Sequence, residues 1–235
     1  MAASLGWRRF GARAEVNFLQ GVQRLHSETM NSTAAPTTVV GATGRVLRLC
    51  NAYTDAWQEV QSERDWEWMR GTTDAPLTVG LQTYTGTALG ASRFGRWRAE
   101  DETYCPYAYI AGSPNSLWPL SLWSLDEFRR NWVYVNNGQS TPIAYAVDET
   151  QNLLVGPAPA VAYRLRAEYW KEPSILTADI DEPDLPVRFE LLPMWRALID
   201  VATADAAPEV LARATRSYNA MHNKLLFDQA RLPTL

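Results

Sequence analysis

Apolar residues recur at intervals of three and four positions in four stretches of the chain, which is the period of an amphipathic α-helix. These stretches are residues 17–30, residues 44–63, the segment that begins at Leu185, and residues 208–229. The apolar stripe of residues 44–63 is the clearest and consists of Val46, Leu49, Cys50, Tyr53, Ala56, Trp57 and Val60. The pattern therefore predicts two helices near each end of the chain.

Local signals place the ends of these helices. Asn17 is suited to cap the first helix, because its side chain can accept a hydrogen bond from a free backbone N–H group. Pro193 would cost about 3 kcal/mol inside an established helix, so we expect the third helix to kink there or to begin later than its stripe. Only residues 205–207 separate it from the last helix, and we expect these two to pack antiparallel.

Between the helical ends, the period changes from 3.6 to 2, and short runs rich in Val, Tyr and Trp alternate with Gly, Pro and Asn turns. In residues 161–170 the alternation places two arginines and a glutamate on one face and apolar side chains on the other. A short helix is expected at residues 125–132, capped by Ser124. The pattern predicts six strands, at residues 78–85, 93–98, 103–110, 143–147, 152–155 and 161–170.

These elements predict an α+β fold, in which a helical bundle carries an inserted, mostly antiparallel β region. We expect residues 17–68 and 185–231 to form the bundle and residues 69–184 to form the insert. Residues 1–16 are interpreted as an N-terminal extension, and residues 232–235 as a C-terminal tail.

Composition excludes several classes of protein. The net charge of -4 and pI of about 5.3 disfavour general affinity for nucleic acid, and no apolar run approaches the ~20 residues that span a bilayer. Cys50 and Cys105 lie far apart without partner ligands, so we expect reduced, buried side chains and no zinc site.

No arrangement of residues predicts catalysis. His26 and His222 each stand alone on a predicted helix, and we interpret both as ordinary surface or interface histidines. The 41–44 segment lacks the lysine of a phosphate-binding loop and is read as the start of a helix. Two acidic groups are interpreted as solvated turn and helix-start charges, because neither has the spacing of a calcium loop or an acid–base pair. The first group is Asp179, Asp181, Asp184 and Glu190, and the second is Glu100, Asp101 and Glu102.

One cationic cluster is a candidate for interaction. It consists of Arg93, Phe94, Arg96, Trp97 and Arg98 on a predicted strand. There are two structural interpretations, in which the arginines face water or pair with carboxylates, and two functional ones, in which they lie at a subunit interface or face passing DNA. We favour the structural and interface interpretations over contact with DNA.

A set of motifs appears in a fixed order along the chain. DWEWMRGT ends the helix that precedes the strands, RFGRW and DEFRR lie among the strands, YWKEPSILTADIDEPDLPVRFELLPMWRAL follows, and the last helix ends in LLFDQ. With this order, residues 17–231 resemble the head-to-tail adaptor, or connector, proteins of tailed bacteriophages. Such proteins begin near a segment like that at Asn17, so Val16 is a candidate alternative start and residues 1–16 are extra.

The resemblance implies a structural virion protein and no enzyme, with no catalytic residues, metal or cofactor. Subunits of this family form a ring, usually dodecameric, beneath the portal, so the implied partners are the portal protein, tail-side proteins and other copies of the chain. DNA would cross the ring only in transit, and the protein would be made in the bacterial cytoplasm and reside at the head–tail junction of the virion. By analogy, the portal-facing candidates are Asp228, Gln229, Arg231, Leu232 and Leu235, and the Arg93–Arg98 cluster would face a neighbouring subunit or the channel.

Two other classes of function stay open at this stage. The ten Trp and ten Tyr could serve a carbohydrate-binding module, which predicts several coplanar exposed rings in a groove. A hydrolase, which we favour less, would need a concave site with convergent polar groups.

Overall fold

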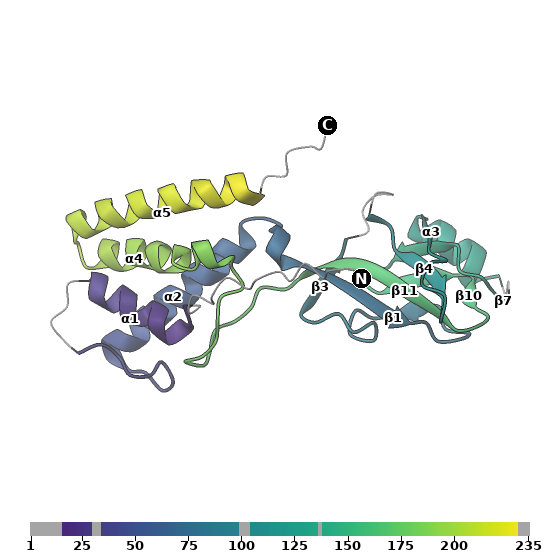
Figure 1. Ribbon diagram of the computed structural model, residues 1–235, viewed down its shortest axis with the longest axis horizontal. Helices are drawn as coiled ribbons and strands as arrows, with labels where there is room; N and C mark the ends of the chain where they lie inside the picture. The colour runs from purple at the N-terminus through teal and green to yellow at the C-terminus, as the bar shows by residue number, and fades with distance from the viewer. Residues whose placement is uncertain (1–15, 30–33, 99–103, 136–137, 230–235) are drawn as a thin grey trace, which may run out of the picture. The chain divides into compact units, whose positions relative to one another are not determined.

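The computed structural model describes residues 16–29, 34–98, 104–135 and 138–229, and they form two compact units (Figure 1). The helical unit comprises the described residues of Met1–Trp68 and Ser174–Leu235. The β unit comprises those of Met69–Pro173. Helices and mostly antiparallel sheets occur together, which confirms the predicted α+β class.

The four predicted helices of the helical unit are all present. They are α1 (Phe18–Glu28), α2 (Gly44–Ser62), α4 (Leu192–Ala204) and α5 (Pro208–Gln229), with short 3₁₀ turns η1 (Glu67–Met69) and η4 (Val187–Phe189). The stripe predicted on α2 is buried from Leu49 to Val60, and its first member, Val46, is half-buried. Both cysteines are free and buried, as predicted.

Helix α1 begins at the predicted cap. The Asn17 side chain accepts a hydrogen bond from the Gln20 amide at 2.9 Å, and the Gln20 side chain accepts one from the Asn17 amide. This reciprocal capping box satisfies two N–H groups that have no partner within the helix. Phe18, Val22 and Leu25 then face the core, in agreement with the pattern.

Helices α1 and α2 approach closely where a glycine meets an aromatic ring. The Tyr53 ring is fully buried on α2 and lies against Gly21 of α1. A Cβ atom at position 21 would be 2.6 Å from the ring, which is well inside van der Waals contact. The absence of a side chain at Gly21 therefore sets the distance between the two helices.

Helix α4 is the centre of the helical unit. It contacts α1, α2 and α5, and its buried residues surround most of the helix, as expected for a helix enclosed by others. It begins at Leu192, so that Pro193 lies in the first turn, where its missing N–H breaks no hydrogen bond. The later start that Pro193 predicted is thus confirmed.

Helix α5 lies antiparallel to α4 after the short 205–207 link (Figure 1). It is held largely by its own contacts with α4 and buries only Val210, Ala214 and Leu225 completely. The other three positions that the pattern turned inward, Leu211, Tyr218 and Met221, are half-buried. A long face of α5 is left exposed.

The acidic segment before α4 has a structural role. The Asp179 carboxylate accepts hydrogen bonds from the Thr38 hydroxyl and the Val39 amide, and the Asp181 carboxylate accepts from the amides of Thr177 and Ala178. The interpretation of these charges as solvated is wrong for Glu190, which is buried and accepts a hydrogen bond from the Val16 amide. A carboxylate buried there satisfies a backbone donor that water cannot reach.

In the described part of the β unit, the two larger sheets enclose the main apolar core. The core contains side chains from both sheets, among them Tyr84, Leu153, Val155, Leu165 and Tyr169. One sheet has β1 (Arg70–Pro76), β11 (Tyr163–Lys171), β4 (Tyr107–Ile110) and β5 (Trp118–Pro119) in that order, with β3 (Phe94–Trp97) also paired to β11. The other has β2 (Thr83–Tyr84), β9 (Leu153–Gly156), β8 (Ala144–Val147) and β6 (Ser121–Leu122), and β7 (Gln139–Ser140) pairs with β10 (Ala158–Pro159).

Strand β11 organises the first sheet. Strand β1 pairs along one edge of β11, and β4 and β3 share the other edge, with β4 opposite its start and β3 opposite its end. The alternation predicted for this strand is confirmed, because Tyr163, Leu165, Ala167 and Tyr169 are buried in the core.

The sequence predicted no strand at β1. Helix α2 ends at Ser62, next to its predicted end at residue 63, but the DWEWMRGT motif, interpreted as the end of a helix, forms the turn η1 and the start of β1. The core side of β1 consists of the small residues Gly71, Thr73 and Ala75, opposite Tyr169, Ala167 and Leu165 of β11. Such residues carry no strand signal, and the pairing with β11 imposes the conformation.

Other strand predictions were too long. Of residues 78–85 only Thr83 and Tyr84 pair, because Thr78 to Leu81 form a turn closed by a hydrogen bond from the Leu81 amide to the Thr78 carbonyl.

The predicted 125–132 helix divides into α3 (Leu125–Phe128), capped by Ser124 as predicted, and a π-helical turn η3 (Arg129–Val133).

Replacing Gly21 with alanine should lower the free energy of unfolding by about 2 kcal/mol, because the new Cβ would overlap the buried Tyr53 ring. Alanine ordinarily favours a helix over glycine by about 1 kcal/mol, so intrinsic propensity predicts the opposite sign. Chemical denaturation followed by circular dichroism measures the difference.

The matched control is Asn219→Ala, on the exposed face of α5. It should change the free energy of unfolding by less than about 0.5 kcal/mol. Equal or greater stability of Gly21→Ala would show that the ring contact does not limit the approach of the helices.

Candidate interaction surfaces

The predicted cationic cluster lies on β3 and contributes mainly to the interior of the β unit. Trp97 is buried, and its indole N–H donates to the Gln151 carbonyl at 2.9 Å. Phe94 is half-buried, with its ring 4.6 Å from that of Trp97 and 5.9 Å from that of Tyr169. These two aromatic residues therefore fix β3 onto the core, while Arg93 is exposed and Arg96 is half-buried.

Arg98 is buried despite its charge. Its guanidinium is 2.8 Å from the Glu168 carboxylate and lies 3.5 Å from the centre of the Tyr104 ring, with the Trp170 ring on a further side at 5.3 Å. A buried cation needs both a counter-ion and polarisable contacts to offset its lost hydration. Arg98 thus stabilises the fold of this unit from within.

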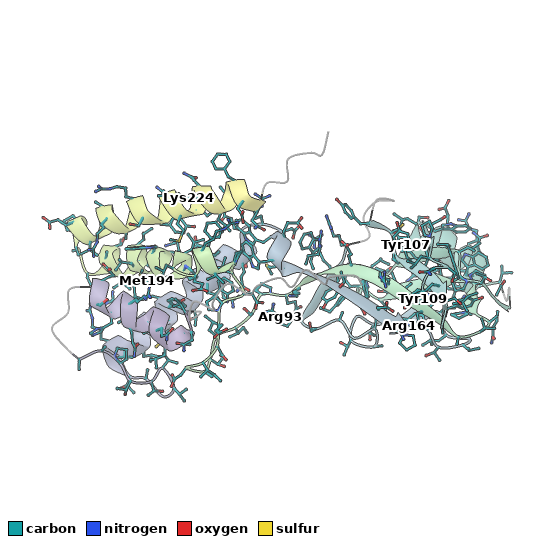
Figure 2. All side chains as sticks on the ribbon, viewed as in Figure 1. Arg93, Tyr107, Tyr109, Arg164, Met194 and Lys224 are labelled. Atoms are coloured by element: carbon teal, nitrogen blue, oxygen red, sulfur yellow. The ribbon has the colours of Figure 1, made fainter. Side chains whose placement is uncertain are left out.

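A second group of charges gathers on the same side of the sheet. Asp74 of β1 accepts hydrogen bonds from Arg164 at 2.8 Å, from Arg166 at 3.1 Å and from the Tyr109 hydroxyl at 2.7 Å. Figure 2 shows Tyr109 and Arg164 together. We call the outer side of this sheet the arginine face, made up of Arg70, Thr72, Asp74, Arg98, Tyr107, Tyr109, Arg164, Arg166, Glu168 and Trp170.

The electrostatics of Asp74 follow from this arrangement. Burial acts to raise the pKa of Asp74, but the hydrogen bonds from Tyr109, Arg164 and Arg166 outweigh it and hold the pKa below its ordinary value. The alternation along residues 161–170 predicted the outward position of Arg164 and Arg166, whereas Asp74 was not predicted because the strand that carries it has no recognisable pattern.

A small cavity of about 150 Å³ opens on the arginine face. It is lined by Thr72, Tyr104, Cys105, Tyr107, Arg166, Ala167 and Glu168. Apolar walls with one cation and one carboxylate at the edge suit a single apolar side chain next to polar groups.

A larger cavity of about 350 Å³ lies on the helical unit, lined by Val16, Arg24, Val187, Arg188, Glu190, Leu191 and Met221. Arg188 also forms an ion pair with Asp228 near the end of α5. Phe227 beside it is 82% exposed. Of the predicted portal-facing residues, Asp228 and Gln229 end α5, and Arg231, Leu232 and Leu235 lie outside the described residues.

The two histidines occupy structural positions. His26 is buried at 4% exposure, so its assignment to a surface was wrong. His222 stacks on Tyr218, and its Nε2 atom is 2.8 Å from the Glu63 carboxylate, which ties α5 to the end of α2. The acidic run 100–102 falls outside the described residues, and within the described ranges no three His, Cys, Asp or Glu side chains gather to hold a metal ion.

The aromatic surplus is used mainly for packing. No tryptophan in the described part of the chain is exposed, and the exposed rings there are Tyr107, Tyr134 and Phe227. Tyr107 lies on β4, Tyr134 directly follows η3 and Phe227 lies near the end of α5, so the exposed rings are spread over separate elements.

Comparison with known protein families decides the class of the protein. The model of the SU10 adaptor protein family matches residues 19–233, which include both units. The chain belongs to the SU10 adaptor protein family. This is a family of structural phage adaptors and not of enzymes, which assigns the protein to the virion, among components that bind one another at the head–tail junction. None of the curated proteins searched matches the chain.

Within the described ranges, no helix of this adaptor combines the length and the apolar composition needed to cross a membrane.

Replacing Asp74 with asparagine should change how stability depends on pH. The pKa of Asp74 is lower in the folded than in the unfolded chain, so its contribution is present above the unfolded pKa of about 4 and is lost as pH falls through the folded pKa. Between about pH 5 and pH 2, the unfolding free energy of Asp74→Asn should therefore fall less steeply than that of the wild type. Urea titrations across this range measure it, with the exposed Glu172→Gln as control; parallel curves for Asp74→Asn and wild type would contradict the prediction.

Arg98→Ala should destabilise the β unit by about 2 kcal/mol, because it removes a buried cation from between the Tyr104 and Trp170 rings and leaves Glu168 without its nearest partner. Thermal unfolding followed by tryptophan fluorescence measures the loss. Arg130→Ala, at an exposed arginine of the same unit, is the control and should cost less than about 0.5 kcal/mol.

Proposed function

We propose that this adaptor assembles into a ring, a dodecamer by analogy, beneath the portal and links the capsid to the tail. DNA passes through the channel of the ring without being held. The observation that carries the proposal is the family match, which extends over residues 19–233 and therefore involves the helical unit and the β unit alike.

The physical basis of the assembly is multivalency. A single contact between one subunit and the portal is weak, but once neighbouring subunits are held in a ring each further contact becomes intramolecular. Avidity then exceeds the affinity of any one subunit by orders of magnitude. A monomer that assembles only on the portal would avoid rings that form in the absence of a capsid.

The end of α5 is proposed to face the portal. Its outer face is exposed over most of its length, and Figure 2 shows Lys224 on it. Phe227 is an exposed ring next to Asp228 and Gln229. Large exposed apolar side chains among polar ones are typical of surfaces that a partner covers.

Lateral and tail-side contacts are proposed for the β unit. Of the cationic cluster, the exposed Arg93 and the half-buried Arg96 are the members best suited to meet a neighbour or the channel, while Trp97 and Arg98 support them from inside. Val133, Tyr134 and Val135 form a run of exposed apolar side chains at the end of η3, which suits a tail-side protein.

Weak contact with DNA in transit fits the charge. The net charge of -4 limits general attraction to phosphates. A channel that bound many phosphates tightly would slow the passage of DNA.

Mixing the purified protein with its cognate portal should give a discrete, ring-sized gain in mass by mass photometry. The portal alone and the protein alone are the two controls. Absence of any ring-sized species, with both components folded, would contradict the proposed function.

A chain truncated after Gln229 should bind the portal at least about tenfold more weakly, because it lacks Arg231, Leu232 and Leu235. A matched truncation that removes residues 1–15 should bind as the full chain does. Titration of the portal with each chain measures both affinities, and equal weakening by the two truncations would argue against a portal-facing C-terminal end.

A further inference from the structure

On the arginine face, the described ion pairs join two carboxylates to four arginines. Asp74 pairs with both Arg164 and Arg166, and Glu168 pairs with Arg98 at 2.8 Å and with Arg70 at 3.9 Å. Each carboxylate therefore serves two guanidinium groups. The side chain of Arg166 is 50% exposed, so its charge is accessible to a partner that lies against the sheet.

The same face has the composition of an interface centre. Arginine and tyrosine are among the side chains enriched where two proteins bury surface, and Tyr107 is 39% exposed beside the cavity of about 150 Å³. The bonds from Arg164 and Tyr109 to Asp74 hold the surrounding groups in place before any partner arrives. A preorganised face loses little side-chain entropy on binding.

The helical unit carries a segment with matching chemistry. Residues 178–184 contain four carboxylates and no cation. Hydrogen bonds to the Asp179 and Asp181 carboxylates fix the loop, and Ile180 between them is 79% exposed. Glu182 and Asp184 are exposed beside it. The segment thus presents one apolar side chain flanked by negative charge.

A closed ring of identical subunits requires two different surfaces that complement each other on every copy. We propose that residues 178–184 of one subunit dock on the arginine face of the next, with Ile180 in the cavity beside Tyr107 and Asp184 opposite Arg166. This inference rests on the proposed ring and names its lateral contact. Charge complementarity and a single apolar side chain that matches a small cavity are the two observations that support it.

A cysteine pair tests the contact directly. One chain carries Ile180→Cys and another carries Thr72→Cys, at an exposed position that lines the cavity, both with Cys105→Ser. Mixed on the portal and oxidised, they should give a disulfide-linked dimer on a denaturing gel. Thr72→Cys mixed with Lys224→Cys, on the exposed face of α5, is the control and should give none.

The outcomes separate this inference from the proposed function. A ring-sized mass gain without the cross-link would overturn the contact and leave the adaptor function standing. No ring-sized mass gain would overturn both. A further chain carries both cysteines. If it cross-links within itself at high dilution and without portal, residues 178–184 occupy the arginine face of their own copy, and the lateral contact is overturned.

Charge exchange gives an independent test. Arg166→Glu and Asp184→Arg should each raise the protein concentration needed for half-occupancy of the portal by about tenfold, and the double variant should restore it to within about threefold. Arg130→Glu, at an exposed arginine away from the arginine face, should leave it unchanged. Equal losses in the single and double variants would show that the two residues do not meet. Neutralising the acidic run 100–102 tests whether that run is the partner of Arg166. If Arg166→Glu and Asp184→Arg still weaken portal binding by about tenfold in that background, the run is excluded as the partner.

Discussion

Both units depend on the same packing constraint, which is the burial of a large aromatic ring against a residue without a side chain. In the helical unit, Tyr53 lies over Gly21 and brings α1 against α2. In the β unit, Tyr169 of β11 covers Gly71 of β1. Each ring removes a large apolar area from water, and each glycine permits an approach that a Cβ atom would prevent. The aromatic surplus of the chain is thus largely explained by its core.

This packing leaves the two surfaces of β11 with different tasks. The inner side chains fill the core, and the outer side chains form an ordered network in which two carboxylates hold four arginines. Contacts within the subunit hold Arg98 by stacking on Tyr104 and Asp74 by a hydrogen bond from Tyr109, so these groups of the arginine face are positioned without a partner. A structural adaptor needs surfaces of this kind, since its activity is binding and its affinity depends on how little must be ordered on assembly.

The helices were predictable because their signals are local and strong. A repeated apolar stripe, the Asn17 cap and the position of Pro193 identify α1, α2, α4 and α5 without knowledge of their neighbours. The alternation in β11 was equally clear. Strand β1 was missed because Gly71, Thr73 and Ala75 are small residues without a strand signal, and their size is explained only by the β11 residues opposite them. The buried positions of His26 and Glu190 were missed because they depend on segments distant in the sequence.

The sequence by itself determined the α+β class, the four helices, the two-sided character of β11 and the resemblance to an adaptor family, because each depends on the period or order of residues along the chain. Only the tertiary structure determined which charged side chains are buried or paired within the fold. It assigned Arg98 to the interior, brought Asp74 to Arg164 and Arg166 across two strands, and fixed the acidic 178–184 segment with Ile180 exposed. The physical reason is that a charged or polar side chain pairs with the groups that lie near it in space. A local sequence pattern contains no information about which groups those are.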